Sequence, residues 1–164
     1  MFTIPSNVIV DHLAIAVKDL EEGINFYTRK LGFQLKERRE TEGEFSGMLS
    51  AVLDGPLTGF TIVLVQGTSR TSQVSRFIDN YGPGVQHIAF LVDDLEKIAI
   101  ELSKNGITFS TDIINGPGLK QLFTMRDKNS GAMFEFIERV EDKSGFDPGN
   151  IQKLFESLEK NDSY

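Results

Sequence analysis

The fold is decided by a phrase that occurs twice, "VDHLAIAVKDLE" at residues 10–21 and "GVQHIAFLVDDLE" at residues 84–96. The two copies contain the only two histidines among the 164 residues. Moving the first copy forward by 75 residues (87 − 12) places His12 on His87 and also aligns an alanine, a valine and the sequence Asp-Leu-Glu. A match of this kind at a fixed distance indicates two copies of one structural unit.

Each copy is followed by the same order of predicted elements. An amphipathic helix pattern begins at Leu20 or Leu95 and is closed by Gly32 or Gly106. Strand-like runs come next, at residues 33–39, 46–53 and 60–66 in the first copy and at 107–114, 119–127 and 132–138 in the second. Each module therefore has the order β-α-β-β-β. A solenoid needs more than two repeats, so the sequence predicts a pseudo-twofold pair.

We expect residues 1–164 to form a single domain, because this length supports one well-buried core. Its parts are module one at about residues 8–67, a connector at 68–83, module two at about 84–140 and a C-terminal helix at about 148–160. The last helix carries an apolar stripe and is expected to close over the pocket as a lid. The stripe consists of Ile151, Leu154, Phe155 and Leu158.

The composition excludes several classes of protein. A net charge of −7 argues against nucleic acid or an anionic membrane as the main partner, because both require a dense basic surface. The sequence has no apolar run long enough to span a bilayer, and its first residues lack the basic start of a signal peptide. The absence of cysteine excludes disulfides and thiolate metal sites, which favours a cytoplasmic location.

Strand periodicity gives both histidines the same orientation. Alternate side chains of a strand share a face, so His12 lies on the face of Ala14, and His87 on the face of Ala89. Each histidine thus points to a surface that is otherwise small or apolar. A single histidine on a strand is typical of a hydrogen-bonded core residue, whereas two at repeat-equivalent positions favour a pair of ligands.

The last predicted strand supplies a carboxylate. In "GAMFEFIERV", residues 131–140, Glu135 shares a face with Met133 and Ile137. Burial of an unpaired carboxylate is costly, and a metal ion held by Glu135 and the two histidines would offset that cost. The alternative places Phe134 and Phe136 inward and Glu135 in solvent.

The internal symmetry predicts the number of ligands. If Gly59 is matched to Gly131, the counterpart of Glu135 in module one is Val63, which cannot bind a metal. Three ligands, two imidazoles and one carboxylate, with open positions are typical of non-haem Fe(II) oxygenases. A filled fourth position would instead favour a Lewis-acid isomerase or lyase. The site therefore favours Fe(II), although another divalent metal can occupy such a ligand set after purification.

These residues resemble the vicinal oxygen chelate superfamily. The segment "DHLAIAVKDLEEGINFYTRKLGF" is similar to its common opening, and the likeness to 4-hydroxyphenylpyruvate dioxygenases runs from about Val10 to Glu159. The segments closest to the metal-binding C-terminal half of those enzymes are "SQVSRFIDNYGPGVQHIAF", "LKQLFTMRD", "MFEFIER" and "GFDPGNIQKLFESLE". The resemblance implies an α+β fold in which two βαβββ modules form an incomplete mixed-sheet barrel, plus a C-terminal helix. It also matches the iron ligands to His12, His87 and Glu135.

The resemblance further implies a set of substrate-binding residues. Most would form a polar wall, and two phenylalanines would form aromatic walls. The set consists of Ser50, Gln66, Gln73, Gln86, Gln121, Phe123, Phe146 and Asn150. Gln66 replaces a family asparagine, and whether it would contact metal or substrate stays open. Ile151 replaces a family phenylalanine, which removes a stacking surface for a phenyl group, so the resemblance bears more on the 2-oxo acid end of the substrate.

The implied activity is oxidative decarboxylation of a 2-oxo acid coupled to hydroxylation, with dioxygen as the second substrate and no catalytic residue beyond the metal ligands. Two alternatives share the scaffold: a metal-dependent isomerase, lyase or epimerase of the glyoxalase type, and a ligand-binding or resistance protein. We include a homodimer among the expected assemblies of so small a chain.

Overall fold

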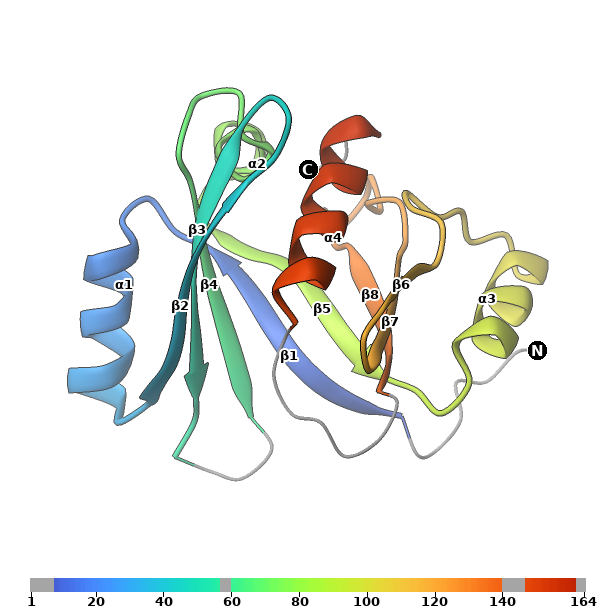
Figure 1. The fold of residues 1–164 in the computed structure, drawn as a ribbon, viewed down its shortest axis with the longest axis horizontal. Coiled ribbons are helices and arrows are strands. Elements are labelled where there is room, and N and C mark those ends of the chain that lie inside the picture. Colours follow the sequence, from blue (N-terminus) through green and yellow to red (C-terminus); the bar gives the residue numbers. More distant parts are fainter. Residues whose placement is uncertain (1–7, 57–59, 140–146, 162–164) are drawn as a thin grey trace.

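The computed structural model describes residues 8–56, 60–139 and 147–161, and its elements follow the predicted order (Figure 1). Module one contains β1 (Ile9–Ala16), α1 (Leu20–Asn25), the π-helical turn η1 (Phe26–Lys30), β2 (Gln34–Glu42), β3 (Gly47–Asp54) and β4 (Thr61–Gly67). Module two contains β5 (Gly84–Leu91), α3 (Leu95–Lys104), β6 (Ile114–Gly116), β7 (Leu119–Phe123) and β8 (Phe134–Arg139). Helix α2 (Gln73–Tyr81) joins the modules, and α4 (Pro148–Lys160) follows β8.

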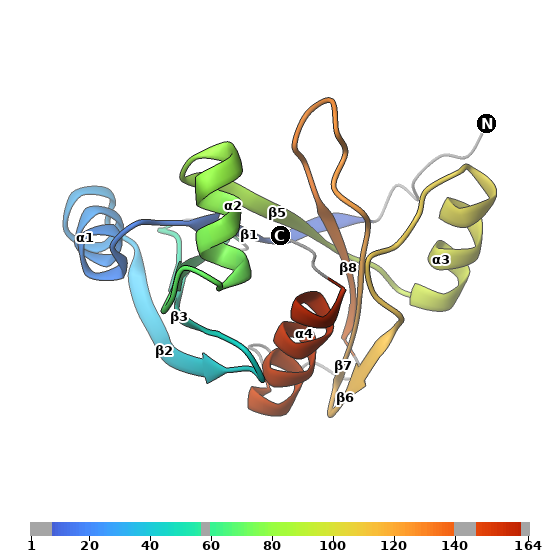
Figure 2. The ribbon, with the colours of Figure 1, turned by 90° about the horizontal axis from the view of Figure 1, so that it is seen from above.

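The described strands form one eight-stranded sheet in the order β2-β3-β4-β1-β5-β8-β7-β6. The first strand of each module pairs in parallel with the last strand of the same module, and the other pairs are antiparallel. The order is symmetric about the β1–β5 pair, so the two modules meet at the histidine strands. The sheet curls without closing, as Figure 2 shows. The fold is therefore the expected α+β pair of βαβββ modules in an incomplete mixed-sheet barrel.

Helices α1 and α3 cover the outer face of the sheet (Figure 1). Leu20 and Ile24 of α1 pack on Leu53 and Leu64, and α3 packs in the same way on module two. The N-terminal aspartates at the two equivalent positions cap these helices, since Asp19 accepts from the amide of Glu22 at 2.9 Å and Asp94 from that of Lys97 at 2.9 Å. Because the outward side chains contact these helices, the alternate side chains face the interior of the half-barrel.

The prediction of a strand over residues 107–114 was wrong. In the structure the chain there is largely irregular, and β6 is limited to Ile114–Gly116. The hydroxyl of Ser110 donates to the carbonyl of Thr124 at 3.2 Å, and the hydroxyl of Thr111 accepts from the amide of Phe123 at 3.2 Å. They supplement a few backbone bonds, such as the one from the amide of Ser110 to the carbonyl of Phe123 at 2.9 Å, and together these bonds hold the segment without a regular ladder.

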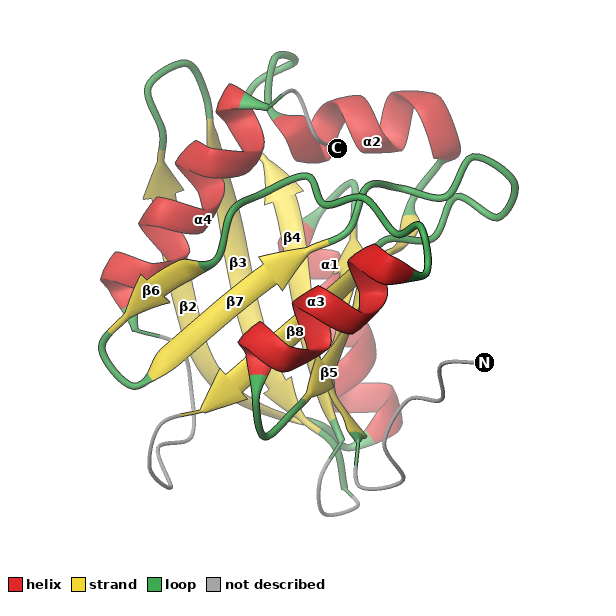
Figure 3. Ribbon diagram, turned by 90° about the vertical axis from the view of Figure 1, so that its right-hand side faces the viewer, coloured by secondary structure: helices red, strands yellow, loops and turns green. Residues whose placement is uncertain are grey.

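Helix α4 lies in the opening of the half-barrel, between β2 and β6 (Figures 2 and 3). On one side, Glu159 accepts a hydrogen bond from Ser46 Oγ at 2.6 Å in the loop after β2. On the other, Lys153 Nζ donates to the carbonyl of Asn115 at 3.3 Å. Phe155 and Leu158 are buried. The helix thus joins both edges of the sheet. Among the described helices, none is both long and apolar enough to cross a membrane.

Candidate metal centre

Three strands bring His12, His87 and Glu135 together inside the half-barrel. Nε2 of His12 lies 3.3 Å from Glu135 Oε2, and Nε2 of His87 lies 3.2 Å from the same oxygen. The two imidazole rings stand almost perpendicular, with 5.5 Å between their centroids. Glu135 is 1% exposed, which excludes the alternative that placed it in solvent. Phe134 and Phe136 instead pack in the cluster with α3.

Two equivalent β-bulges orient the histidines. The β1–β5 register skips Asp11 on β1 and Gln86 on β5, so each bulge adds the residue directly before a histidine. Asp11 Oδ1 contacts His12 Nδ1 at 2.9 Å, and Gln86 Oε1 contacts His87 Nδ1. Because an acceptor faces each Nδ1, a neutral ring carries its proton there and directs the lone pair of Nε2 toward Glu135.

Asp11 is itself held by module two. Arg139, on β8, donates to the Asp11 carboxylate through Nε at 3.0 Å and through a terminal nitrogen at 2.9 Å. Burial raises the pKa of Asp11, but hydrogen bonds from His12 and Arg139 outweigh burial and lower it to about 2. The carboxylate behind His12 is therefore ionised. Behind His87 the equivalent group is a neutral amide, so the two histidines differ in their electrostatic environment.

The charges of the three central groups depend on one another. Burial lowers the pKa of His12, but Asp11 and Glu135 outweigh it and raise that pKa to about 9. Burial raises the pKa of Glu135, but both histidines outweigh it and lower that pKa to about 2. Burial is the main reason that the pKa of His87 is lowered. Without a metal, protonated His12 therefore compensates the charge of Glu135.

The register supports the predicted asymmetry of the centre. Glu135 pairs with Ala89 on β5, and Val63 pairs with Ala14 on β1. Since Ala14 and Ala89 are repeat-equivalent, Val63 holds the position of Glu135 in module one. Gln121 Nε2 donates to Glu135 Oε1 at 2.6 Å, so the carboxylate is fixed through its other oxygen.

The arrangement fits a metal ion. Two atoms that each lie about 2.1 Å from one ion at tetrahedral or octahedral angles are about 3.0–3.4 Å apart. The two nitrogen-to-oxygen separations, 3.2 Å and 3.3 Å, lie in this range. Imidazole and carboxylate donors suit Fe(II), Zn(II) and related ions.

A pocket of about 70 Å³ opens beside the three groups. Four of the candidate substrate residues, Ser50, Gln73, Gln86 and Gln121, line it. Oε1 of Gln73 and Oε1 of Gln121 are buried without a hydrogen-bond partner among the described residues. Buried polar atoms of this kind are suited to binding a polar ligand. Helix α4 contributes the apolar stripe to the same pocket, namely Ile151, Leu154, Phe155 and Leu158.

The other candidate residues lie elsewhere. Gln66 is not among the lining residues, and its Oε1 accepts from the amide of Leu20 at 2.6 Å, which caps α1. Phe123 is buried behind His87, with ring centroids 5.2 Å apart. Asn150 is buried against β6 and outside the lining. Phe146 falls outside the described residues. A substrate contact for these residues stays a prediction.

Sequence reasoning missed four polar residues around the site. Asp11 was detectable, because it occupies the position of Gln86 in the other copy of the phrase. Its partner Arg139 is distant in sequence and gave no such signal. Glu37 and Arg39, on β2, also line the pocket.

The architecture and the buried ligand set define a class, that of paired βαβββ proteins with a candidate metal centre between the modules. Residues 9–136 match the family described as the Glyoxalase/Bleomycin resistance protein/Dioxygenase superfamily. The chain belongs to this superfamily, as its two histidine phrases predicted.

Curated proteins with similar sequences include a dioxygenase and a hemolysin. A 4-hydroxyphenylpyruvate dioxygenase of Pseudomonas aeruginosa is 29% identical over 92% of this chain and 52% of its own length. Hemolysin VllY of Vibrio vulnificus is 27% identical with the same coverage. The chain thus spans about half the length of these curated relatives.

Two solved structures share the fold. A mutant 4-hydroxymandelate synthase from Streptomyces coelicolor superposes with a TM-score of 0.82 and 24% identity, over 95% of this chain and 55% of that one. Methylmalonyl-CoA epimerase from Mycobacterium tuberculosis gives 0.68 and 27% identity, over 79% of this chain and 87% of its own. A 4-hydroxymandelate synthase and a methylmalonyl-CoA epimerase therefore both share the fold of this chain.

Proposed function

We propose that the chain is a non-haem Fe(II)-dependent dioxygenase that converts a 2-oxo acid by oxidative decarboxylation coupled to hydroxylation. The carrying observation is the ligand set of two histidines and one glutamate with an apolar residue, Val63, at the fourth symmetric position. Such a set leaves coordination positions for a chelating substrate and for dioxygen. The similarity to 4-hydroxyphenylpyruvate dioxygenases supports the same reaction class.

His12, His87 and Glu135 would hold the iron, which when bound supplies the redox chemistry. The residues of this chain then position the reactants. Asp11 and Gln86 keep Nε2 of each histidine directed at the centre. Gln73 and Gln121 offer buried amide oxygens as acceptors for a hydrogen-bond donor on the ligand. The α4 stripe covers the apolar part and excludes water, so that substrate and oxidant meet in a dry, ordered site.

The test is anaerobic reconstitution with Fe(II), followed by oxygen-uptake measurements with a panel of 2-oxo acids. We expect uptake that depends on both iron and a 2-oxo acid, with release of carbon dioxide in equal amount. Fully loaded protein that consumes no dioxygen with any member of the panel would contradict the proposal.

An epimerase is the second candidate, because methylmalonyl-CoA epimerase shares the fold at 27% identity. Epimerisation requires a base that removes a proton from carbon. Apart from Glu135, the described residues contribute one carboxylate to the pocket lining, that of Glu37, which forms an ion pair with Arg39. An epimerase would exchange the substrate α-hydrogen with deuterated solvent and consume no dioxygen, so these two readouts separate the candidates.

A third candidate, a metal-free ligand-binding or resistance protein, follows from the name of the superfamily. Elemental analysis of untagged protein prepared without chelators distinguishes it, since the dioxygenase should retain about one metal ion per chain.

A further inference from the structure

The pocket is also lined by two oppositely charged residues whose strand is not adjacent to those of the metal centre. Glu37 and Arg39 both line it, and Arg39 is the only lysine or arginine among the described lining residues. Both lie on β2, which is separated from the β1 strand of His12 by β3 and β4. Neither residue has a role in the ligand set or in its hydrogen-bonded supports.

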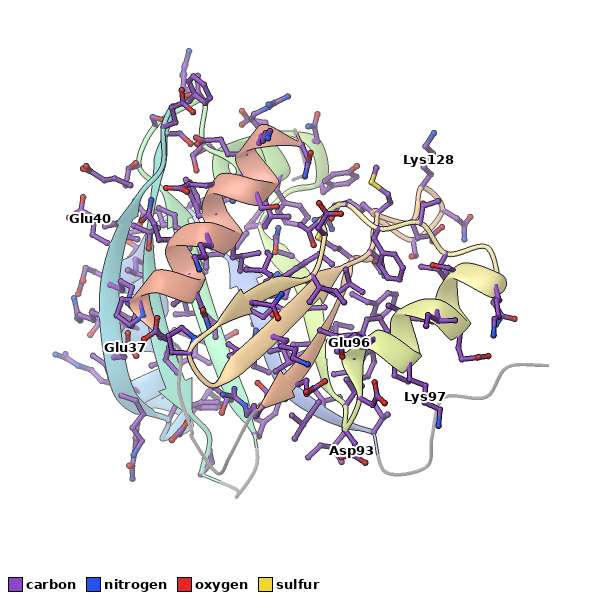
Figure 4. All side chains as sticks on the ribbon, turned by 45° about the vertical axis from the view of Figure 1, so that its right-hand side comes forward. Glu37, Glu40, Asp93, Glu96, Lys97 and Lys128 are labelled. Carbon is purple, nitrogen blue, oxygen red and sulfur yellow. The ribbon has the colours of Figure 1, made fainter. Side chains whose placement is uncertain are left out.

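The strand geometry directs this pair inward. Glu37 and Arg39 are two residues apart and therefore share a face of β2. Their partners on β3 are Val52 and Ser50, which also line the pocket. Figure 4 shows Glu37 on the inner side of β2 and Glu40 on the outside. The Arg39 side chain is 16% exposed, and Glu37 is 33% exposed.

The residue between them has the opposite orientation. Arg38 lies on the outer face, where it forms an ion pair with Glu21 of α1 and is 49% exposed. Arg38 and Arg39 are thus neighbours on the same strand and carry the same charge, but they point to opposite faces of the sheet. Arg38 is a matched control for any property assigned to Arg39.

Apolar side chains, among them Val52, Val63 and Phe155, line the pocket together with Arg39. A guanidinium in such a place requires an acidic partner, and Glu37 is one. Glu37 is the more exposed of the two, so its carboxylate can turn toward water when another anion approaches. The planar guanidinium binds carboxylates through paired N–H donors, and a ligand carboxylate can share it with Glu37 or replace Glu37.

We propose that Arg39 binds a carboxylate at the end of the substrate remote from the metal, so that the substrates are 2-oxo acids with a second carboxylate. The inference rests on the proposed function, which places the 2-oxo acid end at His12, His87 and Glu135. Three strand spacings separate β2 from β1, about 14 Å along the sheet. Both side chains extend inward across the curled sheet, so a spacer as long as a phenyl ring suits the gap.

A neutral substrate end has a different consequence. It would cover the Glu37–Arg39 pair and remove it from water without a new hydrogen bond, which weakens binding. The pocket should therefore prefer the carboxylated member of any matched pair of ligands.

The test is anaerobic calorimetry of the Fe(II)-loaded protein with 4-carboxyphenylpyruvate and with phenylpyruvate. We expect the wild type to bind the carboxylated compound at least about tenfold more tightly, as for a charged hydrogen-bonded pair. Arg39→Gln should remove this preference, because no guanidinium remains to bind the second carboxylate. Arg38→Gln should retain the preference. Glu37→Gln removes the competing carboxylate and should strengthen binding of 4-carboxyphenylpyruvate.

The inference would be overturned if the wild type bound the two compounds with equal affinity, or if Arg39→Gln still preferred 4-carboxyphenylpyruvate. In either case, binding of phenylpyruvate would still support the proposed function. Failure of the loaded protein to bind either 2-oxo acid would overturn both. If Arg39→Gln does not fold, the Glu37→Gln protein decides, because unchanged or weaker binding of 4-carboxyphenylpyruvate in it contradicts competition for Arg39.

Discussion

Val63 and Glu135 occupy equivalent positions in the two modules, the first paired with Ala14 and the second with Ala89. The duplication has thus placed an apolar side chain where symmetry would place a second carboxylate. In the proposed dioxygenase this difference keeps a coordination position open for reactants.

Val63→Glu should add a fourth ligand to the metal centre. We expect the variant to retain metal but to lose at least about tenfold in oxygen uptake, because a protein carboxylate occupies a position needed by the reactants. Metal content and oxygen uptake measured on the same preparation check this. Val63→Leu, which keeps the position apolar, should retain uptake, and a Val63→Glu protein with unchanged uptake would contradict the assignment.

Glu135→Ala should abolish stoichiometric iron binding, because two histidines alone are an incomplete ligand set. Elemental analysis after anaerobic loading measures the effect. Glu138 is the matched control on the same strand, since its carboxylate accepts from the amide of Leu95 at 2.8 Å, at the start of α3. Glu138→Ala should keep about one iron per chain, and iron retained by Glu135→Ala would exclude this centre.

Asp11→Asn should weaken metal binding by about 10- to 100-fold, the usual effect of losing a partner of a ligating histidine. The variant keeps the shape of the side chain but removes the charge behind His12 and weakens the contact with Arg139. Competition with a chelator measures the affinity. Asp93→Asn, at an exposed position before α3, is the control and should leave the affinity unchanged; equal affinities for wild type and Asp11→Asn would refute a supporting role.

The fold was largely predictable from sequence because repetition and strand periodicity both report on it. The two histidine phrases located the modules, and the alternation of Met133, Glu135 and Ile137 gave the correct inward face. Bulges were not predictable, since they depend on the register between β1 and β5, and the bulge at Gln86 is what turns this residue into the pocket. A further register shift beside Lys36 obscured the inward face of β2, and with it Arg39.

Metal binding at pH 7 should release about one proton, because the pKa of His12 in the metal-free protein is raised to about 9 and the metal requires a neutral imidazole. Calorimetry in buffers of different ionisation enthalpy counts this proton. The sign for stability follows from the same shift. Protonated His12 stabilises the metal-free fold fully below its ordinary pKa of 6.5, and this contribution is lost as pH rises through about 9.

Glu135 acts in the opposite direction. Its pKa is lowered to about 2, so its contribution is complete above 4.5 and is lost as pH falls toward 2. The metal-free protein should therefore be most stable between pH 4.5, the ordinary pKa of a glutamate, and pH 6.5, that of a histidine. Denaturant titrations across the pH range can follow this stability. Metal binding at pH 7 without proton release would contradict a charged His12.

Gly116→Ala should displace α4 from the sheet. A Cβ atom on Gly116 would lie 1.1 Å from Oδ1 of Asn150, whose side chain is fully buried and has little room to move. We expect a loss of about 1–3 kcal/mol in the free energy of unfolding, typical of overpacking, together with weaker ligand binding, because α4 carries the apolar wall of the pocket. Denaturant unfolding and calorimetry measure the two effects. The double variant Gly116→Ala with Asn150→Ala removes the clash and should recover most of the lost stability. If the double variant is as unstable as Gly116→Ala alone, the contact between α4 and β6 is not the cause of the loss.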